Sequence, residues 1–415
     1  MSIFIPFKAF LPKSDHAKKI VCRPYDVLNA AEAKKECSGN PNSFYHVIKP
    51  EIDFPQDTDY YHERIYKKGK ENFDKLVNNK LLYQDTESNY YIYQLIMGDH
   101  IQTGIVGCCS IDDYFNNTIK KHELTREDKE EDRKNHIRYS KLNYEPVFFT
   151  YPKVDEIDEL VIKEKKHDPI YNIITDDNIQ HTLWVVSNPN TKEKIRKLFE
   201  QKVSKIYVAD GHHRTAAGAL VGKEIRDQKN GKANDGGAYN YFMAVLFPDN
   251  QLNIIDYNRV VKDLNGMDAD KFLEKVAENF SIEKMKNRYK PRFLHDIGMY
   301  LEGSWYKLSV KDGLFNPNDP VDVLDVTILS KYILNPLLNI KNLRTDKRIE
   351  FVGGIRGLEE LEKRVDSNEM KVAFAMYPVS MQQIMNISDN DMIMPPKVTW
   401  FEPKLRSGFT IYSLS

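Results

Sequence analysis

The sequence predicts a mixed α/β fold arranged in two lobes. Short apolar runs of strand length alternate with longer segments of helical periodicity along the whole chain. The 415 residues are more than a single hydrophobic core usually holds. No internal repeat or low-complexity linker interrupts the pattern. We therefore expect an N-terminal lobe over residues 1–250 and a C-terminal α/β lobe over residues 251–415, and the two could form one continuous catalytic unit.

Strands and helices are expected in alternation from the start of the chain. Asn29 has the character of a helix N-cap, because the segment that follows it is rich in alanine and charged residues. Residues 61–82 show helical periodicity with a charged face. Two strand-like runs, 90–98 and 102–114, are joined by a turn at Gly98–His100. The heavily charged segment 120–141 is expected to be mostly helical, and its plainest interpretation is a helix that faces solvent.

The same alternation continues to the end of the chain. Further strands are expected at 181–187, 205–209, 239–248, 252–261, 348–354 and 371–378, and further helices at 191–202, 216–220, 268–280, 323–335, 358–365 and 380–387. The final run, "MPPKVTWFEPKLRSGFTIY", is strand-like. If it is extended, Lys397 and Thr399 share one face. An ordinary edge strand with exposed lysines is the alternative.

Charge and composition exclude some classes of protein. Lysine and arginine number 60 against 61 acidic residues, so the formal net charge is -1. A nucleic-acid-binding protein usually carries a strong basic excess, so we expect no nucleic-acid partner. A hydrophobic content of 41% with 11% aromatic residues is typical of a packed globular protein.

Cysteine usage and hydropathy bear on the compartment. The four cysteines form no CxxC pair, so we expect buried free thiols rather than a zinc or redox motif. The N-terminal apolar stretch is too short for a signal peptide, and no run reaches membrane-spanning length. We expect a cytoplasmic protein without a membrane partner, either a monomer or a homodimer.

The stretch "KIYVADGHHRTAAGALVG", residues 205–222, holds the densest chemistry in the chain. An apolar strand runs through five polar or flexible residues straight into a helix of small residues. The start of that helix directs unpaired amides and the positive end of its dipole at the turn. Gly211 allows close approach, and His212, His213 and Arg214 add donors and a charge suited to phosphate. The pattern predicts a phosphate cradle.

Asp210 does not fit a simple anion site, because its charge repels the ligand. The aspartate fits if a metal ion or a substrate hydroxyl lies between its carboxylate and the phosphate. The alternative is structural: Asp210 caps the helix, the histidines bond to backbone and Arg214 pairs with an acid. Metal binding by His212 and His213 together is disfavoured, since adjacent residues of a helix do not share a face. No P-loop or protein-kinase motif set is present, so phosphoryl chemistry here needs a different scaffold.

Seven segments carry a resemblance to a known family across nearly the whole chain. In order they are "RPYDVLNAAEA", "NPNSFYHVIKPEID", "KKHELT", "EDRKNHIR", "HTLWVV", "VADGHHRTAAGA" and "MPPKVTWFEPKLRSG". The sequence resembles the domain of unknown function 1015 family. Its DGHHR turn is similar to the phosphate-handling GxxR turn of the ParB/sulfiredoxin-like fold, a group that includes free-serine kinases, among which the resemblance is greatest to those using pyrophosphate. The resemblance implies a ParB/sulfiredoxin-like core with an additional lobe, and transfer of a phosphoryl group from inorganic pyrophosphate to L-serine.

The matched motifs then imply roles for particular residues. Pyrophosphate carries up to four negative charges, so several cations must converge on it, usually with Mg²⁺. The implied phosphate-binding residues are Gly211, His212, His213, Arg214, Arg126, Arg133, Lys397, Thr399 and Lys404. The family more often has serine where this chain has Val398, which leaves any role for the middle position of that motif in doubt.

The acceptor side is implied in the same way. Asp210 is the first choice as general base, with Glu123 second and His213 third, and Asp210 could equally bind Mg²⁺. Arg23, Tyr25 and Asp26 could meet the amino acid, and His122 adds a donor; a simple turn with a buried tyrosine is the alternative for the first three. Two other functions stay open: an ADP- or ATP-dependent kinase of serine or another small hydroxyl compound, and a ParB-like nucleotide-binding regulatory protein.

Overall fold

The computed structural model describes residues 1–233 and 235–414, and it confirms the mixed α/β class. The chain divides into two compact units. The first comprises Met1–Leu252 together with Pro403–Ser415, and the second comprises Asn253–Glu402. The segment from Pro403 onward therefore belongs with the first unit, which differs from the expected C-terminal lobe over 251–415. No helix in the described ranges has the length and apolar character needed to cross a membrane.

The first unit is built on a mixed nine-stranded sheet. Its strand order is β6-β11-β8-β12-β5-β4-β10-β9, with β1 pairing to β5. The strands are β1 (Phe4–Ile5), β4 (Tyr90–Met97), β5 (His100–Ser110), β6 (Ile119–Lys120), β8 (Val147–Tyr151), β9 (Tyr171–Ile174), β10 (Gln180–Val186), β11 (Ile206–Asp210) and β12 (Tyr241–Pro248). Most neighbours are antiparallel, but β11 with β6 and β12 with β8 run parallel. Short additional pairs join β2 (Phe10–Pro12) to β3 (Leu82–Gln84) and β7 (Leu142–Asn143) to β21 (Tyr412–Ser413).

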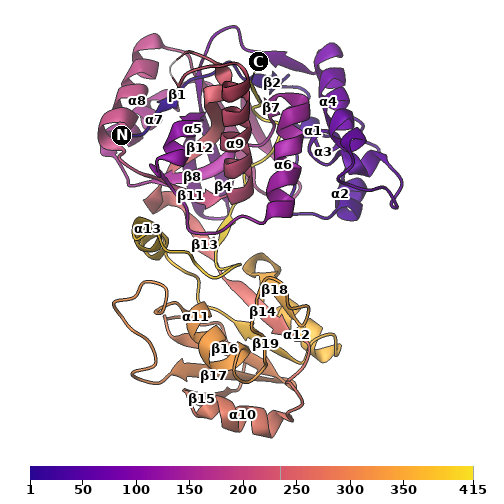
Figure 1. The fold of residues 1–415 in the computed structure, drawn as a ribbon, viewed down its shortest axis with the longest axis vertical. Helices are drawn as coiled ribbons and strands as arrows, with labels where there is room; N and C mark the ends of the chain where they lie inside the picture. Colours follow the sequence, from indigo (N-terminus) through magenta and orange to yellow (C-terminus); the bar gives the residue numbers. More distant parts are fainter. Residues whose placement is uncertain (234, 415) are drawn as a thin grey trace. The chain divides into compact units, whose positions relative to one another are not determined.

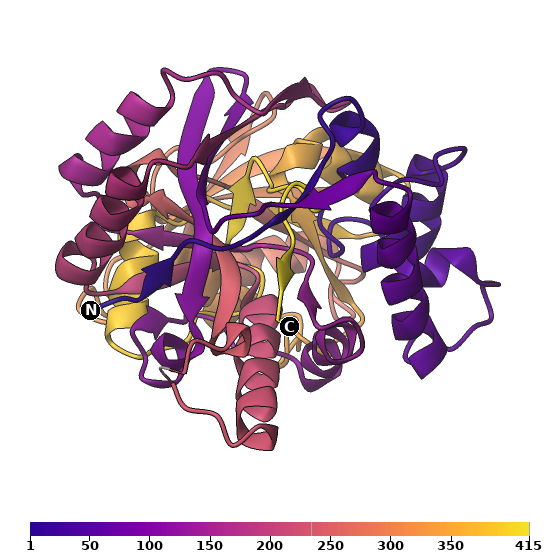
Figure 2. The same ribbon diagram turned by 90° about the horizontal axis from the view of Figure 1, so that it is seen from above.

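Helices cover this sheet and a separate helical layer extends it. Figures 1 and 2 show α6 and α9 side by side, and the indigo N-terminal helices form the separate layer. The helices of this unit are α1 (Ala17–Ile20), α2 (Ala30–Glu36), α3 (Tyr45–Ile48), η1 (Pro50–Asp53), α4 (Glu63–Asn78), α5 (Ile111–Phe115), α6 (Glu127–Ser140), α7 (Asp155–Glu164), α8 (Pro189–Lys202), α9 (His212–Gln228), η2 (Ala238–Asn240) and η3 (Asp249–Gln251). Asn29 caps α2 through a capping box with Glu32, as the sequence predicted. All four cysteines are free and buried, which confirms that expectation.

Small residues let α9 lie very close to the sheet. A side chain at Gly218 would place its Cβ 3.0 Å from Cβ of Phe242 on β12, and one at Gly222 would lie 2.4 Å from the carbonyl oxygen of Tyr239. The contact at Gly222 is closer than packed atoms accept, and the one at Gly218 would require Phe242 to move by a few tenths of an ångström. The small residues after the DGHHR turn therefore allow the middle of α9 to pack closely against β12 and η2.

A bulge lies in β11 just before the turn. Val208 pairs with Phe149 of β8, but Asp210 pairs with Phe148, which leaves Ala209 as an extra residue on β11. Bulges of this kind re-aim the side chains that follow them, and they are frequent next to active sites. The direction of the Asp210 carboxylate is thus set by an irregularity that strand periodicity does not predict.

The second unit has its own antiparallel six-stranded sheet, in the order β15-β17-β16-β19-β14-β18. Those strands are β14 (Tyr257–Val261), β15 (Phe280–Met285), β16 (Asp296–Leu301), β17 (Ser304–Val310), β18 (Ile349–Gly353) and β19 (Val372–Ala375). Its helices are α10 (Ala269–Ala277), α11 (Asp325–Leu329), η4 (Ser330–Leu334), η5 (Gly354–Arg356), α12 (Glu359–Asp366) and α13 (Met381–Asp389). Strands β13 (Asn253–Ile255) and β20 (Trp400–Glu402) pair antiparallel, with Asn253 opposite Glu402, so the chain enters and leaves this unit on adjacent strands.

Candidate active site

The DGHHR turn joins β11 to α9 through a left-handed residue. Gly211 has φ +92° and stands at the N-cap position. A Cβ at Gly211 would lie 2.9 Å from Nε of Arg214, so both the backbone conformation and the space require glycine. The N-cap residue itself has no side chain that could cap the helix start. A cap supplied by Asp210, as in the structural alternative, stays a prediction.

The carboxylate of Asp210 lies between two cations. Its Oδ2 is 3.2 Å from Nη2 of Arg214 and 3.4 Å from Nζ of Lys404. Burial alone would raise the pKa of Asp210, but the charges of Lys404 and Arg214 hold it well below its usual range. A carboxylate held this firmly in its ionised form is a weak proton acceptor, and it is well suited to orienting cations.

Arg214 is buried, and only some of the hydrogen-bond donors of its guanidinium have partners. Its Nη1 donates to the carbonyl oxygen of Pro146 at 3.0 Å, and its Nη2 lies 3.9 Å from Oδ2 of Asp26. The pairing of Arg214 with acids agrees with the structural alternative, yet Nε of Arg214 is buried without any hydrogen-bond partner. One donor of the guanidinium fork thus still has no acceptor beside Gly211.

Two buried imidazoles stand next to the turn. The rings of His122 and His212 meet edge to face with centroids 4.5 Å apart. His122 is 1% exposed, and burial lowers its pKa to about 4. Burial, together with the neighbouring His122, also lowers the pKa of His212 well below its usual value. Both rings are therefore neutral at pH 7.

Polar atoms without partners concentrate at this place. Eight buried side-chain nitrogen or oxygen atoms of the described residues lack a hydrogen-bond partner, and four of them belong to the turn and its neighbour: Nδ1 and Nε2 of His122, Nε2 of His212 and Nε of Arg214. Buried polar groups in folded proteins are nearly always paired, so such a cluster needs an explanation. A bound group rich in oxygen acceptors supplies one.

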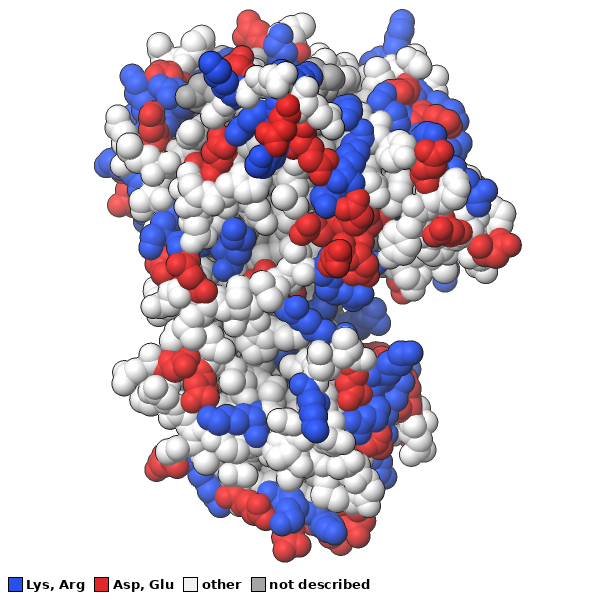
Figure 3. All heavy atoms as spheres, viewed as in Figure 1, with Lys and Arg blue, Asp and Glu red and all other residues white. Residues whose placement is uncertain are grey.

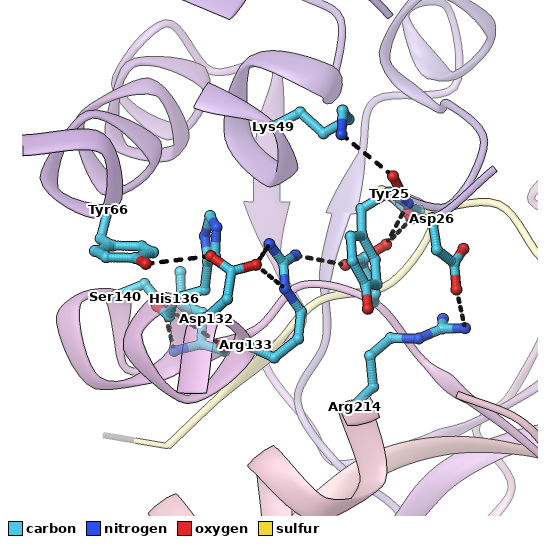
Figure 4. A network of polar contacts seen from close by, with 12 residues as sticks. Tyr25, Asp26, Lys49, Tyr66, Asp132, Arg133, His136, Ser140 and Arg214 are labelled. Atoms are coloured by element: carbon cyan, nitrogen blue, oxygen red, sulfur yellow. Dashed lines mark hydrogen bonds and ion pairs between the residues drawn. The ribbon is translucent and has the colours of Figure 1, made fainter. Parts of the chain in front are cut away.

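The Arg23–Asp26 loop lies against the turn on the other side (Figure 4). Asp26 is exposed and reaches Arg214, as described above. The Tyr25 ring packs under the guanidinium of Arg133, with Cζ of Arg133 3.9 Å from the ring centroid. Arg23 is half-exposed and lies within 3.8 Å of both Glu36 and Asp177. The loop thus carries an arginine and an aspartate, of which Asp26 reaches the turn, and these are the groups that an amino acid's carboxylate and ammonium require.

The residues expected from the charged segment lie in different surroundings. Arg126 is exposed at the N-cap of α6 and hydrogen bonds to Asp128. Arg133 is buried and pairs with Asp132 and Glu145. Glu123 and His213 are half-buried. Figure 3 shows acidic side chains gathered over the start of α6, whose first turn holds Glu127, Asp128 and Glu130. Because its other face buries Arg133, His136, Ile137 and Ser140, α6 is not the simple solvent-facing helix of the plainest interpretation.

The final strand-like run was expected to contribute phosphate-binding residues, and the structure places these residues in two different units. Lys404 belongs to the first unit and reaches Asp210, whereas Lys397 and Thr399 belong to the second unit. The prediction of a strand over Lys397 and Thr399 is wrong: Lys397 has φ +60° in a bend, and β20 begins only at Trp400. The carbonyl of Lys397 accepts a hydrogen bond from Arg259 at 3.0 Å. A role for Lys397 and Thr399 in phosphate binding stays a prediction.

Sequence reasoning missed two residues that complete the surroundings. Glu145 and Pro146 stand in a bend between β7 and β8, and they contact the loop and the turn respectively. The only sequence signal was a lone acid directly before a buried strand, which is common elsewhere. For a divalent cation, no described group of three or more histidine, cysteine or acidic side chains could hold one. Mg²⁺ is commonly bound by one or two carboxylates together with substrate phosphates, and Asp210 fits that lesser requirement.

This chain is similar to one protein family and to several solved structures. The family described as "Protein of unknown function (DUF1015)" matches residues 4–327. A free serine kinase solved in complex with AMP is 12% identical, with a TM-score of 0.36 over 74% of this chain and 90% of that one. SbnI from Staphylococcus aureus, truncated at its C-terminus, is 12% identical with a TM-score of 0.39 over 74% and 87%. A conserved hypothetical protein from Pyrococcus furiosus is 14% identical with a TM-score of 0.36 over 74% and 94%. No curated protein matches the sequence.

Proposed function

The chain belongs to the DUF1015 family, and from that premise we propose that it transfers a phosphoryl group from inorganic pyrophosphate to the hydroxyl of free L-serine. The products are O-phospho-L-serine and phosphate. The observation that carries the proposal is the group of buried, unpartnered polar atoms around Gly211, at the start of a long helix. Phosphate oxygens are the acceptors that such a place requires.

The donor is proposed to bind over Gly211. The amides at the start of α9, Nε of Arg214 and the protonated nitrogen of the His212 ring would donate to its oxygens. Lys404 adds a second cation from the segment that follows β20. Asp210 keeps both cations aimed at the turn, and with Mg²⁺ bound it would be the protein's ligand to the ion. The ion would supply charge neutralisation of the pyrophosphate.

Serine is proposed to bind on the side of the Arg23–Asp26 loop. Arg23 would pair with its carboxylate and Asp26 with its ammonium, which leaves the hydroxyl directed toward the turn. A bond forms between the serine oxygen and the terminal phosphorus as the bridging P–O bond breaks, and the leaving phosphate carries the electron pair. The hydroxyl proton passes to a base. Because Lys404 and Arg214 suppress proton binding at Asp210, we assign this role to Glu123, with His213 as the second candidate.

Phosphorus NMR tests the reaction and its donor together. The purified protein is incubated with L-serine and Mg²⁺, and pyrophosphate, ADP and ATP are offered in separate samples. We expect the phosphoserine resonance to appear with pyrophosphate, with equimolar release of phosphate. Phosphoserine formed only with ADP or ATP contradicts the proposed donor, and no phosphoserine with any donor contradicts the proposed reaction. Addition of glycerol in place of serine checks the acceptor.

A further inference from the structure

The buried carboxylate of Glu145 joins segments that lie far apart in the sequence. It is 9% exposed and stands in the bend that leads into β8. Its Oε1 accepts hydrogen bonds from the amide of Tyr25 at 3.0 Å and from the hydroxyl of Ser407 at 3.1 Å. Its Oε2 lies 3.6 Å from Nη1 of Arg133. One side chain therefore contacts the Arg23–Asp26 loop, α6 and the segment that carries Lys404.

The residue after Glu145 connects the same bend to the DGHHR turn. The carbonyl of Pro146 accepts from Arg214 at 3.0 Å, and β8 continues directly into the pairing with β11. Two consecutive residues directly before β8, Glu145 and Pro146, thus hold the Arg23–Asp26 loop and the DGHHR turn respectively. A cavity lined in part by Arg133, Glu145 and Arg214 lies beside them. The contacts with Tyr25, Ser407 and Arg133 hold the Glu145 carboxylate in place.

Arg133 supports this bend rather than facing a ligand. Nε and Nη2 of Arg133 donate to Oδ2 of Asp132, and its flat face covers the Tyr25 ring (Figure 4). Asp132 in turn accepts from the hydroxyl of Tyr66. Lys49 donates to the carbonyl of Tyr25 at 3.3 Å from the opposite side. With Asp132, Glu145 and Tyr25 around it, Arg133 has little capacity left for a phosphate, so its contribution is to fix the loop.

We infer that Glu145 is a positioning residue that sets where the Arg23–Asp26 loop stands relative to Arg214, and so governs serine binding rather than donor binding. This inference rests on the proposed function for the identity of the acceptor. The donor side has its own supports in Gly211 and the start of α9, and Glu145 reaches the segment of Lys404 only through the hydroxyl of Ser407. Misplacing a binding group by a fraction of an ångström weakens positioning of the substrate it holds.

The first experiment measures the loop itself and needs no activity. Amide hydrogen exchange is followed in the full-length protein for the peptide containing Tyr25, in wild type and in E145A. Because the Tyr25 amide donates to Glu145, we expect its exchange to accelerate at least about tenfold in E145A. Glu164 supplies the matched control: it is 6% exposed and accepts from Thr191 on α8. E164A should leave the exchange of Tyr25 unchanged, and unchanged exchange in E145A would overturn the inference.

The second experiment separates serine from donor. We expect E145A to raise the KM for serine about tenfold and E145Q about threefold, since glutamine keeps an oxygen acceptor for Tyr25 and Ser407. The KM for pyrophosphate should stay within about twofold in both variants. An equal rise in the two KM values would overturn the inference. S407A, which removes one hydrogen bond without changing a charge, should raise the serine KM alone and keeps the test available if E145A does not fold.

The two experiments also separate failure of this inference from failure of the proposed function. If wild type phosphorylates no serine, the proposed function fails, while the exchange of the Tyr25 peptide still decides whether Glu145 positions the loop. If wild type is active and E145A shows normal exchange and normal serine KM, the inference fails alone. Thermal unfolding of E145A and E164A is recorded so that the variants are compared at similar stability.

Discussion

At the scale of single residues, the charge of Asp210 is the most informative feature of the turn. If the turn binds pyrophosphate as proposed, the carboxylate of Asp210 repels that donor and lowers its affinity. Here the carboxylate keeps two cations, Arg214 and Lys404, close to Gly211. Donor binding and turnover should therefore respond in opposite directions when its charge is removed.

We predict that Asp210→Asn lowers kcat at least about a hundredfold, equivalent to about 3 kcal/mol of transition-state stabilisation, and leaves the KM for pyrophosphate equal or lower. The amide no longer repels the donor, but it no longer aligns the cations or holds Mg²⁺. Steady-state kinetics with varied pyrophosphate provide the measurement. Asp227→Asn is the control, because Asp227 lies on α9, the helix that follows the turn, and pairs with Lys223 at the surface. Near-normal kcat in Asp210→Asn would remove the turn from the reaction.

The buried ring of His122 predicts a dependence of stability on pH. Its pKa falls from 6.5 to about 4 on folding, because burial disfavours the charged ring. Between these values the unfolded chain binds a proton that the folded chain does not, so stability is lost as the pH falls from 6.5 toward 4. Each pKa unit corresponds to about 1.4 kcal/mol, so His122 alone should lower the free energy of unfolding by about 3 kcal/mol across this window.

Urea unfolding at pH 7, 6, 5 and 4.5 measures this loss. In His122→Gln the slope of unfolding free energy against pH should be smaller than in wild type over the same window. His16→Gln is the comparison, since the His16 ring is partly exposed beside Asp15. Parallel slopes for wild type and His122→Gln would show that the ring does not titrate as its burial requires.

At the scale of elements, the strand-turn-helix unit depends on a glycine with two separate constraints. Gly211→Ala adds strain from φ +92°, and its Cβ also displaces the Arg214 side chain. We predict that the backbone strain lowers the free energy of unfolding by about 1–3 kcal/mol. The displacement of Arg214 should in addition raise the KM for pyrophosphate by more than this loss of stability explains. Gly39→Ala separates the two, because Gly39 has φ +76° but nothing within 4 Å of the added Cβ. Equal effects of both substitutions on pyrophosphate binding would contradict the prediction.

Elements defined by local chemistry were predictable from the sequence. The capping box at Asn29, the helix over Glu63–Asn78 and the turn into α9 each follow from residues within a few positions of one another. The run before Trp400 misled, because alternation of Lys397 and Thr399 resembles a strand while the chain there adopts a left-handed bend. The bulge at Ala209 has no local signal, since it is defined by the pairing with β8.

The candidate site was predictable in its charges and not in its connections. Asp210, Gly211 and Arg214 are recognisable in the sequence, because an acid, a glycine and a basic residue stand close together in one turn. Glu145 does not, because its partners Tyr25, Arg133 and Ser407 are brought together only by the complete fold. Arg133 has the residue type expected of a phosphate ligand, and only its burial between Asp132 and Glu145 indicates a different role.

At the scale of the whole molecule, the second unit is an insertion between two parts of the first. Residues 253–402 begin and end on the paired strands β13 and β20, and residues 403–415 return to the first unit. We predict that residues 1–252 joined to 403–415 through a short Gly/Ser linker unfold in one cooperative transition, whereas residues 1–252 alone are markedly less stable. The missing segment would remove Lys404, Ser407 and the buried Arg406.

Intrinsic fluorescence in urea measures this difference, because Trp184 is the single tryptophan of the first unit in the sequence, and Trp305 and Trp400 belong to the second. The isolated stretch 253–402 should fold independently, since its sheet and its apolar cluster lie within its own residues. Equal urea midpoints for 1–252 with and without the returning segment would contradict the prediction.

The order of the chain also sets an order of assembly during synthesis. A ribosome delivers Asp210 and Glu145 well before Ser407, and it makes the whole inserted sheet in between. In a nascent polypeptide that has not yet reached Lys404, Asp210 pairs with one cation instead of two, and Glu145 lacks the hydroxyl of Ser407. Both contacts therefore form only after the last thirteen residues, 403–415, have been made.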